Sequence, residues 1–195
     1  MHHVTASHAP TWTDAAPAAS RPPRSRAIRV LVLTGFGFAW AAAGLLKGDA
    51  PGWCWIVLLS IVVALASHGV QSLRRVAAAA EPLAAPEAER QRRAGRWLTW
   101  TSAIEGVAIL LAVNIVANLG HPQWQTAAAM LVVGLHFLPL AFALESRAHV
   151  VTGVVLSAWA LGYPWLFAAG AVSAAGPLGA GVVLLASAMV AQRRR

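Results

Sequence analysis

The sequence predicts an all-α membrane protein, a polytopic bundle of six transmembrane helices with both termini in the cytoplasm. Three observations predict this class. The 195 residues are 58% hydrophobic and 11% charged, whereas charges make up about a quarter of a soluble domain. Several apolar runs reach the roughly 17–25 residues that a helix needs to cross a bilayer. The arginines gather in alternate connections between these runs, which is the positive-inside pattern.

Five apolar runs are long enough to span a bilayer, and a sixth is interrupted by proline. The expected spans are residues 28–46, 53–73, 97–119, 124–144, 150–163 extended to about 167, and 169–190. A proline pushes the residue before it away from helix, so Tyr163-Pro164-Trp165 is the expected turn between the last two spans. Pro177, between Gly176 and Gly179, is then expected to kink the sixth helix.

The segments outside the spans are polar, basic or rich in small residues. Residues 1–27 are rich in Ala, Pro, Ser and His, and we expect a disordered basic tail. Residues 28–190 form the expected six-helix domain, and 191–195 form a second basic tail. The connection at about 74–96 is expected to be cytoplasmic. Within it, residues 77–96 carry prolines and a charged run, which indicates a solvated loop or a short surface helix.

The 15 lysines and arginines give an independent test of the number of spans. With six spans, every arginine falls on one side of the membrane. Lys47 alone falls on the other side. Five or seven spans would place the last three arginines outside, so the charge pattern favours six spans with cytoplasmic termini in the cell membrane.

Several chemistries find no support in the sequence. A single cysteine, Cys54, excludes an intramolecular disulfide framework and multi-cysteine metal sites. The histidines of the first tail have no second cluster with ligand spacing, and no P-loop or HExxH motif is present. We therefore expect no metal, no cofactor and no nucleic-acid partner. The expected partners are the lipid bilayer and a lipophilic small molecule, and association with further copies of the chain is left open.

Ionisable residues inside a span are costly, and each is a functional hypothesis until a partner is found. Glu105 lies eight residues into the third span, roughly 12 Å deep at 1.5 Å per residue. His136 lies nine residues from Glu145, at the cytoplasmic end of the fourth span. The two spans are antiparallel and joined by a short link, so a contact between Glu105 and His136 is expected. Such a pair can hold or deliver a proton, or it can be a hydrogen bond that only joins two helices.

Other polar and aromatic residues are weaker candidates. Asn114 shares a face of the third span with Asn118, about half a turn from Glu105. We expect Asn114 to face the bundle and to contribute to substrate binding. Glu145 and Arg147 are expected to form an ion pair at the interface. Deep aromatic residues are candidates to line a cavity and stabilise a cation, although packing is the ordinary role of such residues; they are Trp40, Trp159, Phe36, Phe38, Phe137 and Tyr163.

Small residues recur at helical spacing in two places. Gly44 and Gly48 lie four apart near the end of the first span, and Gly176, Gly179 and Ala180 lie in the sixth. Such patterns let helices approach closely. They indicate packing and carry no chemistry.

The run Val133-Gly-Leu-His-Phe-Leu-Pro-Leu-Ala141, with Glu105 one span earlier, resembles a signature of small bacterial multi-span membrane proteins. In size, span count and intramembrane acid, the chain more distantly resembles the membrane-bound terpene cyclases of actinobacterial indole-sesquiterpenoid and diketopiperazine–terpene pathways. Those are similar to fungal meroterpenoid cyclases, in which a buried carboxylic acid protonates an olefin or epoxide. The resemblance implies Glu105 as the acid and His136 as its partner. The fungal pattern has two intramembrane carboxylates, whereas here Glu145 lies only at the margin of a span.

The leading hypothesis is a membrane enzyme acting on a lipophilic isoprenoid. Glu105 would be the general acid and His136 would tune it, while Trp40, Phe137, Trp159, Tyr163 and Asn114 would contact the substrate. The alternatives are a small permease or proton-coupled carrier that uses the pair as a relay, and a membrane scaffold in which the pair is structural. The scarcity of buried charge and the lack of an internal repeat lean against a transport pathway.

Overall fold

The computed structural model describes residues 23–79, 85–143 and 146–193. These residues are helical apart from short links, and no strand occurs among them. Six of their helices are long and apolar enough to cross a membrane, which confirms the all-helical class and the number of span-length helices. The elements are α1 (Pro23–Lys47), α2 (Gly52–Ala78), α3 (Ala85–Asn118), η1 (Pro122–Trp124), α4 (Gln125–Ala143), α5 (Arg147–Leu166), η2 (Gly170–Val172) and α6 (Ala175–Arg193).

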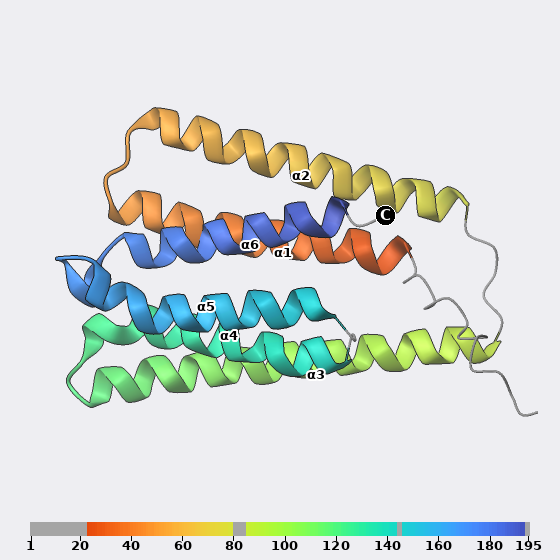
Figure 1. The fold of residues 1–195 in the computed structure, drawn as a ribbon. Helices are drawn as coiled ribbons and strands as arrows, with labels where there is room; N and C mark the ends of the chain where they lie inside the picture. The colour runs from red at the N-terminus through yellow and green to blue at the C-terminus, as the bar shows by residue number, and fades with distance from the viewer. Residues whose placement is uncertain (1–22, 80–84, 144–145, 194–195) are drawn as a thin grey trace, which may run out of the picture.

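The helices pack side by side in the spatial order α2, α1, α6, α5, α4, α3 (Figure 1). Consecutive helices are antiparallel, so α1 begins and α6 ends at the same end of the bundle. We call this the basic end, because the described parts of α1, α2, α3 and α6 all carry arginines there. Helices α2 and α3 are consecutive in sequence but lie at the two edges of the row, so each has a neighbouring helix on one side only.

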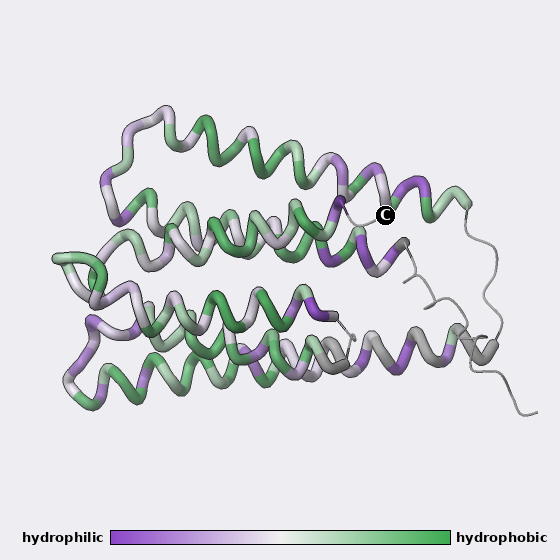
Figure 2. Tube along the Cα trace, in the orientation of Figure 1, coloured by the Kyte–Doolittle hydropathy of each residue, from purple (hydrophilic) through white to green (hydrophobic). Residues whose placement is uncertain are grey.

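The hydrophobic core lies mainly in the four central helices, and Leu58 and Leu65 of α2 also belong to it. Its most buried side chains include Leu156, Ala160, Tyr163, Leu184 and Ala188 on α5 and α6. The outer faces remain apolar, as expected of helices surrounded by lipid, and the hydrophilic residues gather toward the helix ends (Figure 2).

Glycines bring α1 and α6 into backbone contact. A Cβ added to Gly181 would lie 2.5 Å from the backbone nitrogen of Ala41, and one added to Gly44 would lie 2.7 Å from that of Leu178. Neither position has space for a side chain, so the two helices can pack this closely only with glycine there. The packing role expected for Gly44 is confirmed.

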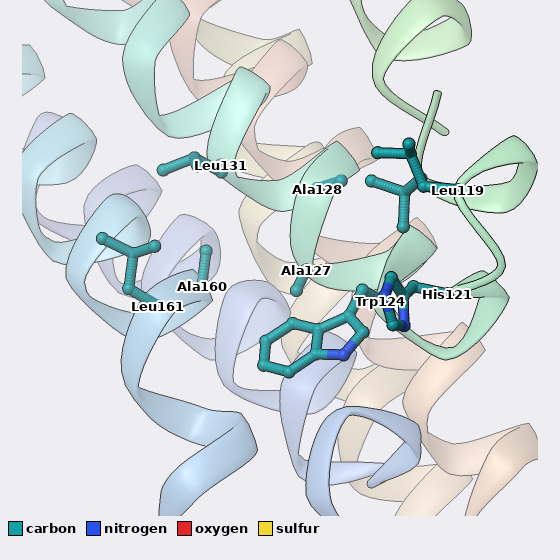
Figure 3. Close-up of a pocket in the computed structure, with 9 residues that line it drawn as sticks. Leu119, His121, Trp124, Ala127, Ala128, Leu131, Ala160 and Leu161 are labelled. Carbon is teal, nitrogen blue, oxygen red and sulfur yellow. The ribbon is translucent and has the colours of Figure 1, made fainter. Parts of the chain in front are cut away.

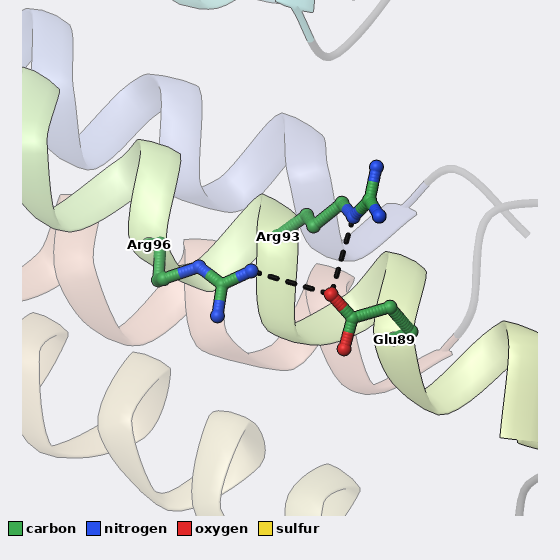
Figure 4. Close-up of polar contacts among 3 residues, drawn as sticks. All are labelled: Glu89, Arg93 and Arg96. Atoms are coloured by element: carbon green, nitrogen blue, oxygen red, sulfur yellow. Dashed lines mark hydrogen bonds and ion pairs between the residues drawn. The ribbon is translucent and has the colours of Figure 1, made fainter.

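Helix α3 differs from the sequence expectation at its start. It runs unbroken from Ala85, so residues 85–96 form the first turns of a span-length helix in place of a loop or a separate surface helix. Glu89 contacts Arg93 at 3.2 Å and Arg96 at 3.3 Å, one and two turns further along (Figure 4). Residues 85–96 are mostly Ala, Glu, Gln and Arg, which favour helix. Ion pairs between charged residues on one helix face also favour helix, so α3 extends beyond the apolar run.

The other boundaries also shift. Helix α1 begins at Pro23, so residues 23–27 are helical; residues 1–22, for which we expect a tail, lie outside the described part of the chain. Helix α5 continues through Pro164 to Leu166, and the turn follows at 167–174. Pro164 lies in the last turn of the helix, and only two residues of α5 follow it. Pro177 lies in the first turn of α6, where an N–H has no helical acceptor, so the kink expected inside the sixth helix is replaced by a helix start.

Candidate functional site

The candidate site lies between α3 and α4. Helix α3 turns one face toward α4, and Thr101, Glu105, Ala108 and Ala112 lie on it at helical spacing, each partly buried. The chain then reverses through Gly120, whose φ of 81° is one that glycine adopts without strain. The N–H of His121 donates to the carbonyl of Val116, which closes the end of α3. This short connection fixes the register of α4 against α3.

Glu105 and His136 meet across this interface, as the sequence predicts. His136 Nε2 lies 3.4 Å from Glu105 Oε2, and each side chain is 15% exposed. At this distance a protonated imidazole and a carboxylate form an ion pair, and a small closing movement would allow a proton to pass between the two atoms. The remaining exposure leaves the pair reachable from the side of the bundle.

A second histidine, His149, is buried on α5 against Phe137. His149 is 4% exposed, and its ring centroid is 5.8 Å from that of Phe137. Helices α4 and α5 approach closely beside it, because a Cβ on Gly153 would lie 2.7 Å from the carbonyl oxygen of Gly134. Sequence reasoning missed His149, since a histidine two residues after Arg147 at the start of a span looks like an interfacial residue. Its position on the buried face of α5, with Thr152 and Leu156, was the available signal.

A buried polar contact joins α5 to α6. Thr152 Oγ1 lies 2.8 Å from Ser187 Oγ. Thr152 also donates to the carbonyl of Ala148, and Ser187 to the carbonyl of Val183, one turn earlier in their own helices. Hydroxyls are satisfied in this way inside membrane bundles. This contact was not among the sequence candidates, because isolated Thr and Ser residues in apolar runs carry no distinguishing pattern.

Two of the expected substrate-contacting aromatics fix the link between α5 and α6. Trp159 Nε1 donates to the carbonyl of Gly176 at 2.9 Å, and Tyr163 Oη donates to the carbonyl of Ala171 at 2.9 Å. The two rings stack with centroids 6.3 Å apart, and Tyr163 is completely buried. These contacts give both residues a structural role, and a role in substrate binding stays a prediction.

The remaining aromatic candidates are spread over the bundle. Trp40 and Phe38 pack against the core on α1, and Phe137 does so on α4. Phe36 is 53% exposed and points away from the core. Phe137 follows His136 in sequence, but it packs against Gly153 and His149 of α5. Trp40, Trp159 and Tyr163 belong to the packing of α1, α5 and α6.

The expectation that Asn114 faces the bundle is wrong. Asn114 is exposed, and its Nδ2 donates to the carbonyl of Leu110 in its own helix at 2.7 Å. It lies half a turn from Glu105, as the spacing requires. Because α3 is an edge helix, only the Glu105 face is covered by a neighbour. Asn114 therefore lies on the face of α3 opposite Glu105, and a role for it in substrate binding stays a prediction.

An apolar hollow of about 370 Å³ lies on the same α3–α4 interface, further from the basic end (Figure 3). Its volume lies in the range of small-molecule sites. The hollow exists because alanines line part of it, and Trp124 and His121 lie at one end. It is lined by Val116, Leu119, His121, Trp124, Ala127, Ala128, Leu131, Ala160 and Leu161. None of the expected site residues lines it.

Two further expectations concern charge and metal. Glu145 lies outside the described residues, so the pair expected with Arg147 is not described; Arg147 itself is exposed at the start of α5. In the described part of the chain, no three His, Cys, Asp or Glu side chains gather as a metal site would need.

Comparison with known proteins gives no relative. No family model, no curated protein and no solved structure matches the chain.

Proposed function

We propose that the chain is an integral membrane enzyme that protonates an olefin or epoxide of a lipophilic isoprenoid, with Glu105 as the general acid and His136 as its partner. In this proposal the basic end faces the cytoplasm, since a membrane protein retains its arginine-rich connections there. The observation that carries the proposal is the contact of 3.4 Å between Glu105 and His136 in a span-length part of the bundle.

The chemistry follows from where the pair lies. Among the described residues of the apolar stretch of α3, Glu105 is the one acidic side chain, and it is 15% exposed rather than sealed in the core. A carboxylic acid in a medium of low dielectric transfers its proton to an apolar double bond without competition from bulk water. A side chain that only joined two helices would need no access from outside.

The proposed reaction is an isomerisation. The O–H bond of Glu105 breaks as its proton forms a C–H bond with the π electrons of one double bond, leaving a carbocation. A second double bond of the same molecule attacks this cation and forms the ring. The neutral imidazole of His136 accepts the proton that the cyclic cation loses, which restores a double bond, and passes it to the Glu105 carboxylate to re-form the acid. Substrate and product then have the same composition.

The edge position of α3 supports access for such a substrate. One side of α3 packs on α4, and its other faces are exposed. A hydrocarbon chain lying along the α3–α4 interface would reach from Glu105 to the hollow at Val116, roughly 16 Å further along the helix at 1.5 Å per residue. The hollow offers apolar space for the end of the chain that does not react.

Turnover of polyprenyl compounds by detergent-purified protein tests the proposal. The wild type is compared with Glu105→Gln, which keeps the shape of the side chain and removes its proton. Glu89→Gln is the matched control, because Glu89 lies on the same helix and is exposed. We expect cyclised product from the wild type and from Glu89→Gln, and none from a folded Glu105→Gln variant. Product from all three would overturn the assignment of Glu105.

The same preparations separate this function from its alternatives. A proton-coupled carrier would move protons into liposomes only when its substrate is present, and it would leave that substrate chemically unchanged. A scaffold would show neither transport nor turnover.

A further inference from the structure

The exposed face of α3 carries polar residues where a helix surrounded by lipid would be apolar. Asn114 and Asn118 are both exposed in the part of α3 that is apolar enough to span a membrane. Of the hydrogen-bonding groups of the Asn114 amide, one N–H is used, on the carbonyl of Leu110. The amide oxygen and the second N–H are thus available to a partner, and leaving them in hydrocarbon is costly.

The residues around Asn114 follow a coiled-coil pattern. Alternating steps of three and four residues connect Trp100, Ala103, Val107, Leu110, Asn114 and Ala117. All are exposed except Ala117, which is partly buried, so the pattern lies outside the bundle. Asn114 therefore falls at a heptad core position, and a polar side chain at such a position specifies the register of a helix pair.

We propose that this face of α3 binds the same face of a second copy of the chain, as a parallel pair with Asn114 opposite Asn114. A two-fold axis along the membrane normal makes the two α3 helices parallel and brings identical residues together. The carboxamide is both donor and acceptor, so two copies satisfy each other across the axis. The surface is therefore self-complementary, which argues for a second copy over an unrelated helix.

The pairing leaves the candidate active site free. Nine residues separate Glu105 from Asn114, which is two and a half turns, so the two side chains lie on opposite faces of α3. Glu105 faces α4 in the same chain while Asn114 faces the second copy. The inference does not depend on the proposed activity, and loss of pairing is expected to leave the Glu105–His136 contact in place.

Association of the full-length protein in lipid vesicles, measured by energy transfer between labelled copies at increasing dilution with lipid, tests the proposal. We expect Asn114→Leu to raise the dissociation constant of the dimer roughly 3- to 30-fold, the range for interhelical hydrogen bonds in membranes. Ser67→Leu is the control, since it removes an exposed polar group from α2 at the other edge. It should leave the dissociation constant unchanged.

Disulfide cross-linking then locates the interface. In a Cys54→Ser background, Leu110→Cys places a thiol in the proposed interface, and Ile115→Cys places one on a neighbouring exposed face of the same helix. We expect oxidation to cross-link the first variant and not the second. A wild type that stays monomeric at every dilution would overturn the proposal, as would equal cross-linking of both variants or an unchanged dissociation constant for Asn114→Leu.

Discussion

At the scale of single residues, Glu105 and His136 meet because the chain reverses within a few residues between α3 and α4. The tight reversal at Gly120 and the short η1 leave little freedom in the register, so equal distances from the basic end become equal heights in the bundle. This is why residue numbers alone predicted the contact, which the structure places at 3.4 Å.

Replacing His136 tests whether it acts on Glu105. His136→Gln keeps a polar side chain but removes the group that gains and loses a proton. We expect turnover to fall about 100-fold or more, within the range of general acid–base contributions. The pH profile of turnover should also lose the limb that belongs to histidine. His68→Gln, at an exposed position on α2, should match the wild type in both rate and profile.

Replacing Tyr163 tests whether its hydroxyl serves packing or contacts the substrate. Tyr163→Phe removes the donor to the carbonyl of Ala171 inside a fully buried environment. We expect a loss of about 0.5–1.5 kcal/mol in the free energy of unfolding, measured by denaturant or heat in detergent, with turnover of the folded variant retained. If stability were unchanged and turnover lost, the hydroxyl would act on the substrate and the structural role would be wrong.

At the scale of helices, backbone contact between α1 and α6 joins two of the four central helices of the row. Gly181→Ala places a methyl group 2.5 Å from the backbone nitrogen of Ala41, and neither backbone can move without separating the helices. We expect a loss of about 1–3 kcal/mol, as for overpacked cores. Gly106→Ala on α3 is the matched change, because its methyl meets nothing within 4 Å. A thermal unfolding comparison that showed equal effects would contradict this account of the contact.

The sequence predicted where the six helices lie, but it did not predict all of the residues at which they begin and end. The apolar runs located the six span-length helices of the described residues, because a run of that length is what a helix needs to cross a bilayer. The ends depend on local contacts that composition does not show. In the added turns of α3, Glu89 pairs with Arg93 and Arg96. Pro177 fits the first turn of α6, where its missing N–H would have no helical acceptor, and Pro164 falls in the last turn of α5.

At the scale of the whole molecule, the order of helices in the row decides which faces are covered. The sequence predicted that Asn114 lies opposite Glu105, and this angle is correct. It also predicted that Asn114 faces the bundle, which is wrong because α3 stands at an edge. Hydropathy is the same for an edge helix and a central one in a membrane, so a single sequence does not distinguish them.

Orientation is a second property of the whole molecule, and thiol labelling in intact cells tests it. In the Cys54→Ser background, Gln123→Cys lies in the exposed link between α3 and α4, and Arg147→Cys lies at the exposed start of α5. A membrane-impermeant maleimide should label the first in intact cells, and the second only after permeabilisation. The reverse pattern would contradict the proposed cytoplasmic position of the basic end.

The central claim is that Glu105 delivers a proton to carbon, and incubation with a polyprenyl olefin in heavy water tests it most directly. Membranes holding the wild type or Glu105→Gln are incubated with the olefin, and the extracted product is weighed by mass spectrometry. The account predicts a cyclic product from the wild type that carries one deuterium bound to carbon, and no product from Glu105→Gln. Unlabelled product, equal product from both proteins, or no product from a folded wild type would contradict it.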